Sequence, residues 1–252
     1  MADIGVVGSG NVGANTAFFI AERGVTDVSL YDIREGYSSG IALDIMEAAP
    51  IRMYRNKIKG IDSLSGLSGT ETIVIAAGSV REPGMAREDL FAKNREIILD
   101  LAEKIHETAP EAVVLVATEP VDICTTLFIR NSNHPANKVM GLGGALDSAR
   151  LRYMLARELS VSVENVTALV IGRHSEDMII LPEYTRISGV PVTQLIDEAA
   201  IESLKEETRN AGDLIVNLSQ RASAYYAPSA TAAEIADCVH MDLKRMFSVS
   251  VY

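Results

Sequence analysis

Ile4-Gly-Val-Val-Gly8-Ser-Gly10-Asn-Val-Gly13 decides the fold, because a short apolar run leads directly into a glycine-rich turn. Residues 4–7 are typical of a buried strand, and residues 11–23 have a helical pattern. In such a strand–turn–helix unit, Gly8 permits a tight turn, Gly10 lets the backbone approach a pyrophosphate, and Gly13 lets the helix pack closely. The helix N-terminus offers N–H groups and partial positive charge to phosphates. The turn therefore predicts dinucleotide binding.

Asp32 supports this prediction, because it ends the next predicted strand, about 20 residues beyond the last glycine. A carboxylate there can accept hydrogen bonds from both ribose hydroxyls and would repel a 2′-phosphate, so NAD is favoured over NADP. Arg34 follows two residues later and could soften that preference. The alternative is that Asp32 is a plain turn residue.

Outward from the turn, short apolar runs alternate with amphipathic stretches. Strands are predicted at 4–7, 28–31, 72–76, 112–117 and 138–141, and helices at 11–23, 36–48, 87–108 and 121–131. This alternation predicts an α/β fold, a doubly wound parallel sheet with helices on both sides. Beyond residue 143 the pattern is α+β, with helices at 145–159, 196–221 and 229–244, antiparallel strands within 166–172 and 178–192, and a turn at Ser188-Gly189. We expect a dinucleotide-binding domain over 1–142 and a substrate-binding, catalytic domain over 143–252.

The end of the sequence alternates apolar and polar residues over 247–252, as a half-buried strand does. The sequence stops there with no turn and no partner strand, and unpaired edge strands are a liability. We therefore expect the chain to be truncated at its C-terminus.

Composition narrows the function. The net charge of −11 over 252 residues argues against nucleic acid, which requires a positive surface. No apolar run is long enough to span a membrane, and the apolar residues that follow Asp3 form a strand rather than an export signal. Cys124 and Cys238 form neither a metal-ligand pattern nor a disulfide framework. These features favour a cytoplasmic protein that binds a small molecule.

Charged residues gather in three later segments. Arg81 and Arg87 lie in a glycine- and proline-containing loop after the strand 72–76, at the sheet edge where ligands bind, although they could be solvated loop residues. Asp147 and Arg150 are three residues apart on one helix and share a face. His174 follows a predicted strand, and an imidazole near that carboxylate and arginine suits acid–base chemistry on an anionic substrate.

Together these segments resemble the lactate/malate dehydrogenase family over the whole chain, in order. The resemblance rests on the glycine turn, Asp32 and the segments 81–87, 120–122, 146–150 and 172–174. It implies a Rossmann domain followed by a catalytic domain, the cofactor NAD, and a homodimer or homotetramer. It further implies NAD-dependent interconversion of malate and oxaloacetate. The residues expected to bind NAD are Gly8, Gly10, Asn11, Val12, Gly13, Asp32, Ala77, Gly78, Asn94 and Thr118, and no metal is expected.

The resemblance also implies catalytic roles. His174 would exchange the hydroxyl proton, and Asp147 would orient its imidazole. Arg150 would hold one carboxylate through its planar guanidinium, and Arg87 would polarise the reacting carbonyl. Arg81 stands where lactate enzymes typically carry glutamine, and it would pair with the second carboxylate of oxaloacetate.

Three positions depart from the family pattern. Glu119 stands where asparagine usually contacts the substrate oxygen, Ser175 replaces a glycine, and Ala224 replaces a threonine. To be compatible with a dicarboxylate, Glu119 must be protonated, turned away or paired with an arginine. Two alternatives therefore stay open, a dehydrogenase for another 2-hydroxy acid, such as a lactate-like one, and a non-catalytic NAD-binding protein.

Overall fold

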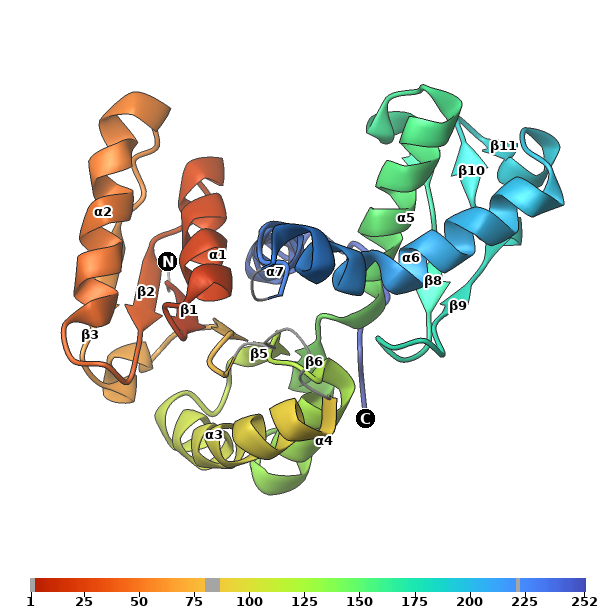
Figure 1. Cartoon of the computed structure of the whole chain (residues 1–252). Helices are drawn as coiled ribbons and strands as arrows, with labels where there is room; N and C mark the ends of the chain where they lie inside the picture. Colours follow the sequence, from red (N-terminus) through yellow and green to blue (C-terminus); the bar gives the residue numbers. More distant parts are fainter. Residues whose placement is uncertain (1–2, 80–86, 221–222) are drawn as a thin grey trace.

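A six-stranded parallel sheet forms the centre of the computed structural model, which describes residues 3–79, 87–220 and 223–252 (Figure 1). Its strand order is β3-β2-β1-β4-β5-β6, the order of a doubly wound dinucleotide-binding sheet. The strands are β1 (Ile4–Val7), β2 (Val28–Tyr31), β3 (Ile58–Ile61), β4 (Thr72–Ile75), β5 (Val113–Val116) and β6 (Val139–Gly141). The predicted fold class is confirmed.

Helices cover both faces of this sheet, which explains why its central strands are mostly apolar. On one face lie α1 (Asn11–Arg23) and α2 (Tyr37–Arg52), and on the other lie α3 (Arg87–Thr108) and α4 (Val121–Asn131) (Figure 1). All four residues of β1 and of β4 are buried. The parallel strands all end at the same edge, so the segments that follow β1, β2, β4 and β5 gather there.

The edge strand β3 is the one sheet strand that the sequence analysis did not predict. Its sequence, Ile58-Lys59-Gly60-Ile61, mixes a charged residue and a glycine into a short run. Among the described strands it pairs only with β2, and of its four residues only Ile58 is buried, so it shows no continuous apolar run. Gly60 is required by packing, since a Cβ there would lie 2.3 Å from the backbone nitrogen of Ser39 in α2.

The rest of the chain packs a long helix pair against short strands. The elements are α5 (Gly143–Leu159), β7 (Val166–Thr167), β8 (Val170–Ile171), β9 (Ile179–Ile180), β10 (Arg186–Ile187), β11 (Val190–Pro191) and α6 (Glu198–Ser219). Short 3₁₀ turns lie at Leu64–Leu67, Ala136–Lys138, Val163–Asn165, Pro182–Tyr184 and Val192–Gln194. The hairpin β10–β11 turns at Ser188 and Gly189, whose φ angles are 48° and 88°, as the sequence predicts.

The last helix and the terminal segment return to the first sheet. Helix α7 (Tyr226–His240) packs against α1 and β4 and also contacts α5. It therefore lies between α1 and α5 (Figure 1). Ser250 forms an antiparallel bridge to Gly141 of β6, with backbone N···O distances of 2.8 and 2.9 Å. The expectation that the terminal segment has no partner is therefore wrong. The partner of the terminal segment is β6, which is distant in the sequence, so the local pattern could not reveal the pairing.

Within these described ranges, no helix combines the length and the apolar character needed to cross a membrane.

Candidate active site

The glycine turn lies between β1 and α1 and is shaped for close backbone packing. Gly8 has a φ of 99°, and a Cβ there would lie 2.6 Å from the backbone of Ala77. A Cβ on Gly13 would lie 1.7 Å from the carbonyl oxygen of Gly8. The N-cap residue Gly10 has no side chain to cap α1, and a Cβ there would meet nothing within 4 Å. The N-terminal N–H groups of α1 therefore face open space that an anion can occupy.

Asp32 lies beside this turn, at the end of β2. Its carboxylate accepts hydrogen bonds from the backbone N–H groups of Ser9 and Arg34, at 2.9 and 3.1 Å, and two from the guanidinium of Arg34, at 2.9 and 3.1 Å. Burial raises the pKa of Asp32, but the hydrogen bonds from Arg34 and Ser9 outweigh it and hold the pKa below its usual value. The ionised carboxylate is placed to accept ribose hydroxyls, while Arg34 is engaged by Asp32 and stacked on Tyr37.

The remaining predicted cofactor residues come together where β4 and β5 end. The hydroxyl of Thr118 donates to the carbonyl oxygen of Ala77 at 2.7 Å. Gly78 packs on Thr118 so closely that a Cβ would lie 2.8 Å from the threonine methyl group. Asn94 of α3 is fully buried, and its amide donates to the carbonyl oxygen of Glu119 at 2.6 Å. These contacts fix the loop after β5, which carries Glu119, against the loop after β4.

A buried carboxylate–imidazole pair forms the second half of the site. Asp147 of α5 is fully buried, and its Oδ2 lies 2.7 Å from Nδ1 of His174. Arg150, one turn later, donates to the other oxygen of Asp147 at 3.4 Å. Because Asp147 occupies Nδ1, Nε2 is the ring nitrogen of His174 that is left for acid–base chemistry.

Asp122 fixes the backbone of the same histidine, a role that the sequence analysis did not assign. Its Oδ2 accepts a hydrogen bond from the backbone N–H of His174 at 2.8 Å, and its Oδ1 accepts one from the hydroxyl of Ser250 at 2.6 Å. Three segments, 52 and 76 residues apart along the chain, therefore meet at one carboxylate. The motif Pro120-Val121-Asp122 was the only signal for it.

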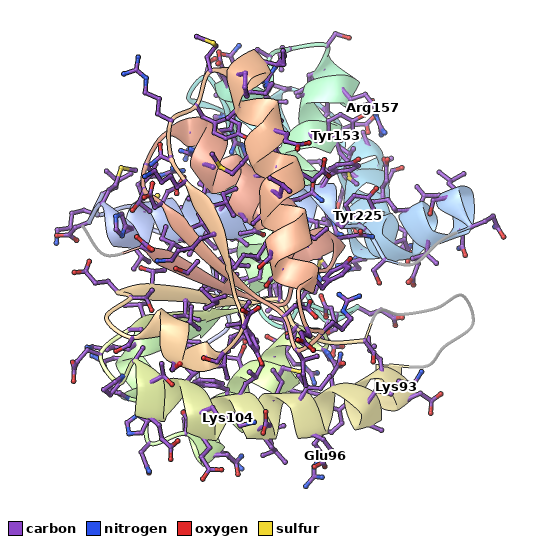
Figure 2. The ribbon with its side chains drawn as sticks, turned by 90° about the vertical axis from the view of Figure 1, so that its left-hand side faces the viewer. Lys93, Glu96, Lys104, Tyr153, Arg157 and Tyr225 are labelled. Atoms are coloured by element: carbon purple, nitrogen blue, oxygen red, sulfur yellow. The ribbon has the colours of Figure 1, made fainter. Side chains whose placement is uncertain are left out.

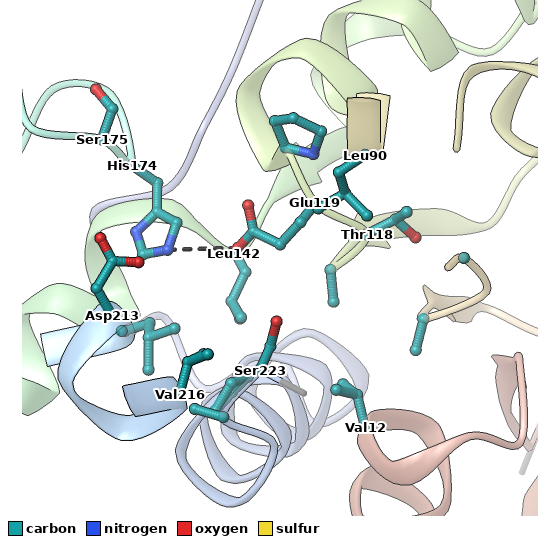
Figure 3. Close-up of a pocket in the computed structure, with 18 of the residues that line it drawn as sticks. Val12, Leu90, Thr118, Glu119, Leu142, His174, Ser175, Asp213, Val216 and Ser223 are labelled. Carbon is teal, nitrogen blue, oxygen red and sulfur yellow. Dashed lines mark ion pairs between the residues drawn. The ribbon is translucent and has the colours of Figure 1, made fainter. Parts of the chain in front are cut away.

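The two halves line one pocket, shown in Figure 3. Val12 and Thr118 lie at one end of the pocket and His174 at the other, with the side chain of Glu119 between Thr118 and His174. Arg150 also lines the pocket, and its buried Nε has no hydrogen-bond partner among the described residues. A buried guanidinium nitrogen without a partner faces a desolvation penalty that a bound carboxylate would relieve.

Helix α6 contributes residues that the sequence analysis missed. Arg209, Gly212, Asp213 and Val216 all line the pocket. Their spacing places them on one stripe of the helix, and Figure 3 shows Asp213 and Val216 below His174. The sequence signal that could have revealed them is the presence of the charged residues Arg209 and Asp213 on the same helix stripe as Gly212 and Val216.

The predicted arginine loop cannot be placed in this way. Arg81 lies outside the described residues. Arg87 begins α3, and its side chain also lies outside the described part of the chain. Their proposed roles rest on the sequence.

Two of the three departures are accommodated locally. The positive φ in the loop after β8 belongs to Gly172, at 84°, and not to Ser175, so serine is not strained there. Ala224 lines the pocket, and the neighbouring Ser223 lines it too and carries a hydroxyl (Figure 3). The third departure, Glu119, contacts the histidine itself, since its Oε1 lies 3.4 Å from Nε2 of His174.

Comparison with known proteins gives a consistent result. The family model described as lactate/malate dehydrogenase, NAD binding domain, matches residues 2–141, and the one for the alpha/beta C-terminal domain matches residues 144–252. A malate dehydrogenase of Heliobacterium modesticaldum is 37% identical over 99% of this chain and 81% of its own. The apo structure of malate dehydrogenase from Picrophilus torridus superposes with a TM-score of 0.95 at 38% identity, covering 100% of this chain and 79% of that one. Lactate dehydrogenase from Cryptosporidium parvum, in complex with lactic acid and nicotinamide adenine dinucleotide, gives 0.95 at 31% identity, covering 100% and 81%.

Proposed function

Because the chain belongs to the lactate/malate dehydrogenase family, we propose that it is an NAD-dependent oxidoreductase that interconverts malate and oxaloacetate. The observation that carries this proposal is the buried pair of His174 and Asp147, which opens into the same pocket as the dinucleotide turn. An acid–base histidine beside a nicotinamide site is what reversible oxidation of a hydroxy acid requires.

The residues present fit NAD. The open space at Gly10 and the N-terminus of α1 suit the pyrophosphate, and Asp32 suits an adenosine ribose without a 2′-phosphate. When bound, NAD supplies the hydride acceptor for carbon 2 of malate.

The protein's own residues then handle the proton and the charges. Nε2 of His174 accepts the hydroxyl proton during malate oxidation and returns it during oxaloacetate reduction. Asp147 holds the opposite nitrogen and stabilises the imidazolium. Arg150 pairs with the substrate carboxylate next to the reacting carbon, while Arg87 polarises the carbonyl and Arg81 holds the second carboxylate.

The direct test measures NADH oxidation with oxaloacetate and, as a comparator, pyruvate. Turnover with oxaloacetate and much less with pyruvate is expected, because pyruvate lacks the carboxylate assigned to Arg81. The substitution Arg81→Gln should lower that ratio. NADH binding without turnover of any 2-oxo acid would contradict the proposal and favour a non-catalytic NAD-binding protein, whereas a preference for pyruvate would favour a lactate-like dehydrogenase.

Cofactor choice gives a separate prediction. The substitution Asp32→Asn removes the charge that repels a 2′-phosphate and releases Arg34, which Asp32 now holds. The ratio of kcat/KM for NADPH to that for NADH should rise at least about 10-fold, since a hydrogen bond to a charged group contributes about 1.5–3 kcal/mol. Kinetics with both cofactors measure it, and an unchanged ratio would refute the assigned role of Asp32.

We also propose a division of labour and a homo-oligomer. Residues 1–142 bind NAD and residues 143–252 bind substrate, a division supported by the start of α5 at Gly143. A homodimer or homotetramer is supported by exposed apolar side chains on and beside α2, including Leu43, Ile51 and Met53. Light scattering should give at least twice the 27.1 kDa chain mass, and a monomer would contradict the proposed oligomer.

The two buried cysteines, Cys124 and Cys238, form no disulfide, which supports the expected reducing cytoplasm.

A further inference from the structure

The imidazole of His174 lies between two carboxylates that come from different elements. Asp147 of α5 lies at Nδ1, at 2.7 Å, and Oε1 of Glu119 lies at Nε2, at 3.4 Å. Figure 3 shows this second contact as a dashed line across the pocket. The carboxylate of Glu119 thus faces the nitrogen that has to reach the substrate.

Glu119 is anchored in this position by its backbone and by its second oxygen. The buried Asn94 donates to its carbonyl oxygen at 2.6 Å. Its Oε2 accepts a hydrogen bond from the backbone N–H of Val121, the first residue of α4, at 3.2 Å. A carboxylate at a helix N-terminus is stabilised by the helix dipole. The 44% exposed side chain can still move toward solvent.

A protonated Nε2 has one N–H, and the reacting oxygen must come within about 2.6–3.2 Å of it. Glu119 and a substrate oxygen therefore compete for the same proton. We propose that Glu119 is a resident acceptor for the Nε2 proton of His174, which the substrate oxygen replaces, and that it sets the pH range over which the site holds the proton needed for 2-oxo acid reduction. The proposal rests on the proposed function, because it assigns catalysis to His174.

Among the residues that the structure describes, the other charged groups around His174 do not replace Glu119 at Nε2. Arg150 donates to Asp147, and Asp122 binds the backbone N–H of His174. Within the histidine's own loop, Arg173 pairs with Asp177. The remaining charged residues nearby, within the described part of the chain, are Arg209 and Asp213, which line the pocket from α6, and Glu176 of the same loop.

The two carboxylates raise the pKa of His174. Burial lowers the pKa of His174, but the hydrogen bonds to Asp147 and Glu119 outweigh it and raise the pKa to about 10. Oxaloacetate reduction needs the protonated ring, so its kcat/KM falls as pH rises through that pKa. Malate oxidation needs the neutral ring, so its kcat/KM rises through the same pKa. Both profiles report the free enzyme.

The test compares the parent protein with Glu119→Gln, which keeps the shape of the side chain and removes its charge. Loss of an opposite charge at this distance should move both pH profiles, and the His174 ring titration followed by NMR, about 1 to 3 units lower. The control is Glu96→Gln, which removes the same charge. Glu96 lies on the outer face of α3 (Figure 2), and its side chain is 72% exposed. This control should leave both readouts unchanged.

The outcomes separate this inference from the proposed function. A ring titration that is the same in Glu119→Gln and in the parent would overturn the role of Glu119, even if oxaloacetate is reduced. If the His174 titration is lower in Glu119→Gln but the parent protein turns over no 2-oxo acid, the contact is upheld and the proposed function is contradicted instead. An equal shift in Glu96→Gln would also overturn the proposal, because it would make the effect one of net charge.

Discussion

Replacing His174 with asparagine is expected to lower kcat in both directions by about 10³-fold. Asparagine can still hydrogen-bond, but it cannot accept and return a proton, and general acid–base catalysis contributes about 10²–10⁴-fold. The residues proposed to bind NAD lie on other elements, after β1, β2, β4 and β5, so the affinity for NADH should change little. Steady-state kinetics with oxaloacetate and malate, together with NADH fluorescence titration, measure both effects.

A second histidine provides the control for this prediction. His240 ends α7 and does not line the pocket, so His240→Asn should retain the parent kcat. If His174→Asn retained more than about a tenth of the parent kcat, a residue other than His174 would have to move the proton, because the loss would fall below the range for general acid–base catalysis.

Replacing Arg150 with lysine is expected to lower kcat/KM for oxaloacetate by about 100-fold or more. The side chain is only 12% exposed, and its Nε is buried without a partner among the described residues. Lysine keeps the charge but cannot form two parallel hydrogen bonds to a carboxylate. Disrupting a buried charge pair costs about 2–5 kcal/mol, and each 1.4 kcal/mol is tenfold. Much of the loss should appear in KM.

The same helix offers a matched control. Arg157 of α5 points to the outer surface (Figure 2), where it pairs with Glu207 at 2.6 Å. Arg157→Lys should leave kcat/KM within about twofold, because exposed ion pairs contribute about 0–1 kcal/mol. Equal losses in Arg150→Lys and Arg157→Lys would show that α5 tolerates no change, and would remove the case for a carboxylate contact at Arg150.

Much of the site was predictable because its residues lie at the ends of recognisable elements. The glycine turn follows β1, Asp32 ends β2 and His174 follows β8, and each position is visible in the local pattern of apolar runs. Asp147 and Arg150 share a helix face, which their spacing already predicts. The structure places the imidazole and Asp147 2.7 Å apart, a distance that no local pattern gives.

Residues whose partners are remote in the sequence were not predictable. Asp122 holds both the backbone of His174 and the side chain of Ser250, so its role exists only when three segments fold together. Arg209 and Asp213 reach the pocket because α6 packs along α5. The edge strand β3 buries only Ile58 of its four residues, so its sequence lacks the apolar run that marks the central strands.

The sequence by itself determined the doubly wound sheet and the dinucleotide turn, because short-range periodicity and turn chemistry encode strands, helices and phosphate-binding loops. The acid–base roles proposed for His174 and Asp147 came from the family resemblance rather than from periodicity. Only the tertiary structure decided what Glu119 contacts. The sequence left it protonated, turned away or paired with an arginine. Among the described residues, the fold places its carboxylate 3.4 Å from Nε2 of His174. That outcome depends on where β5, α4, α5 and β8 end relative to one another, which is set by packing of the whole core rather than by any local segment.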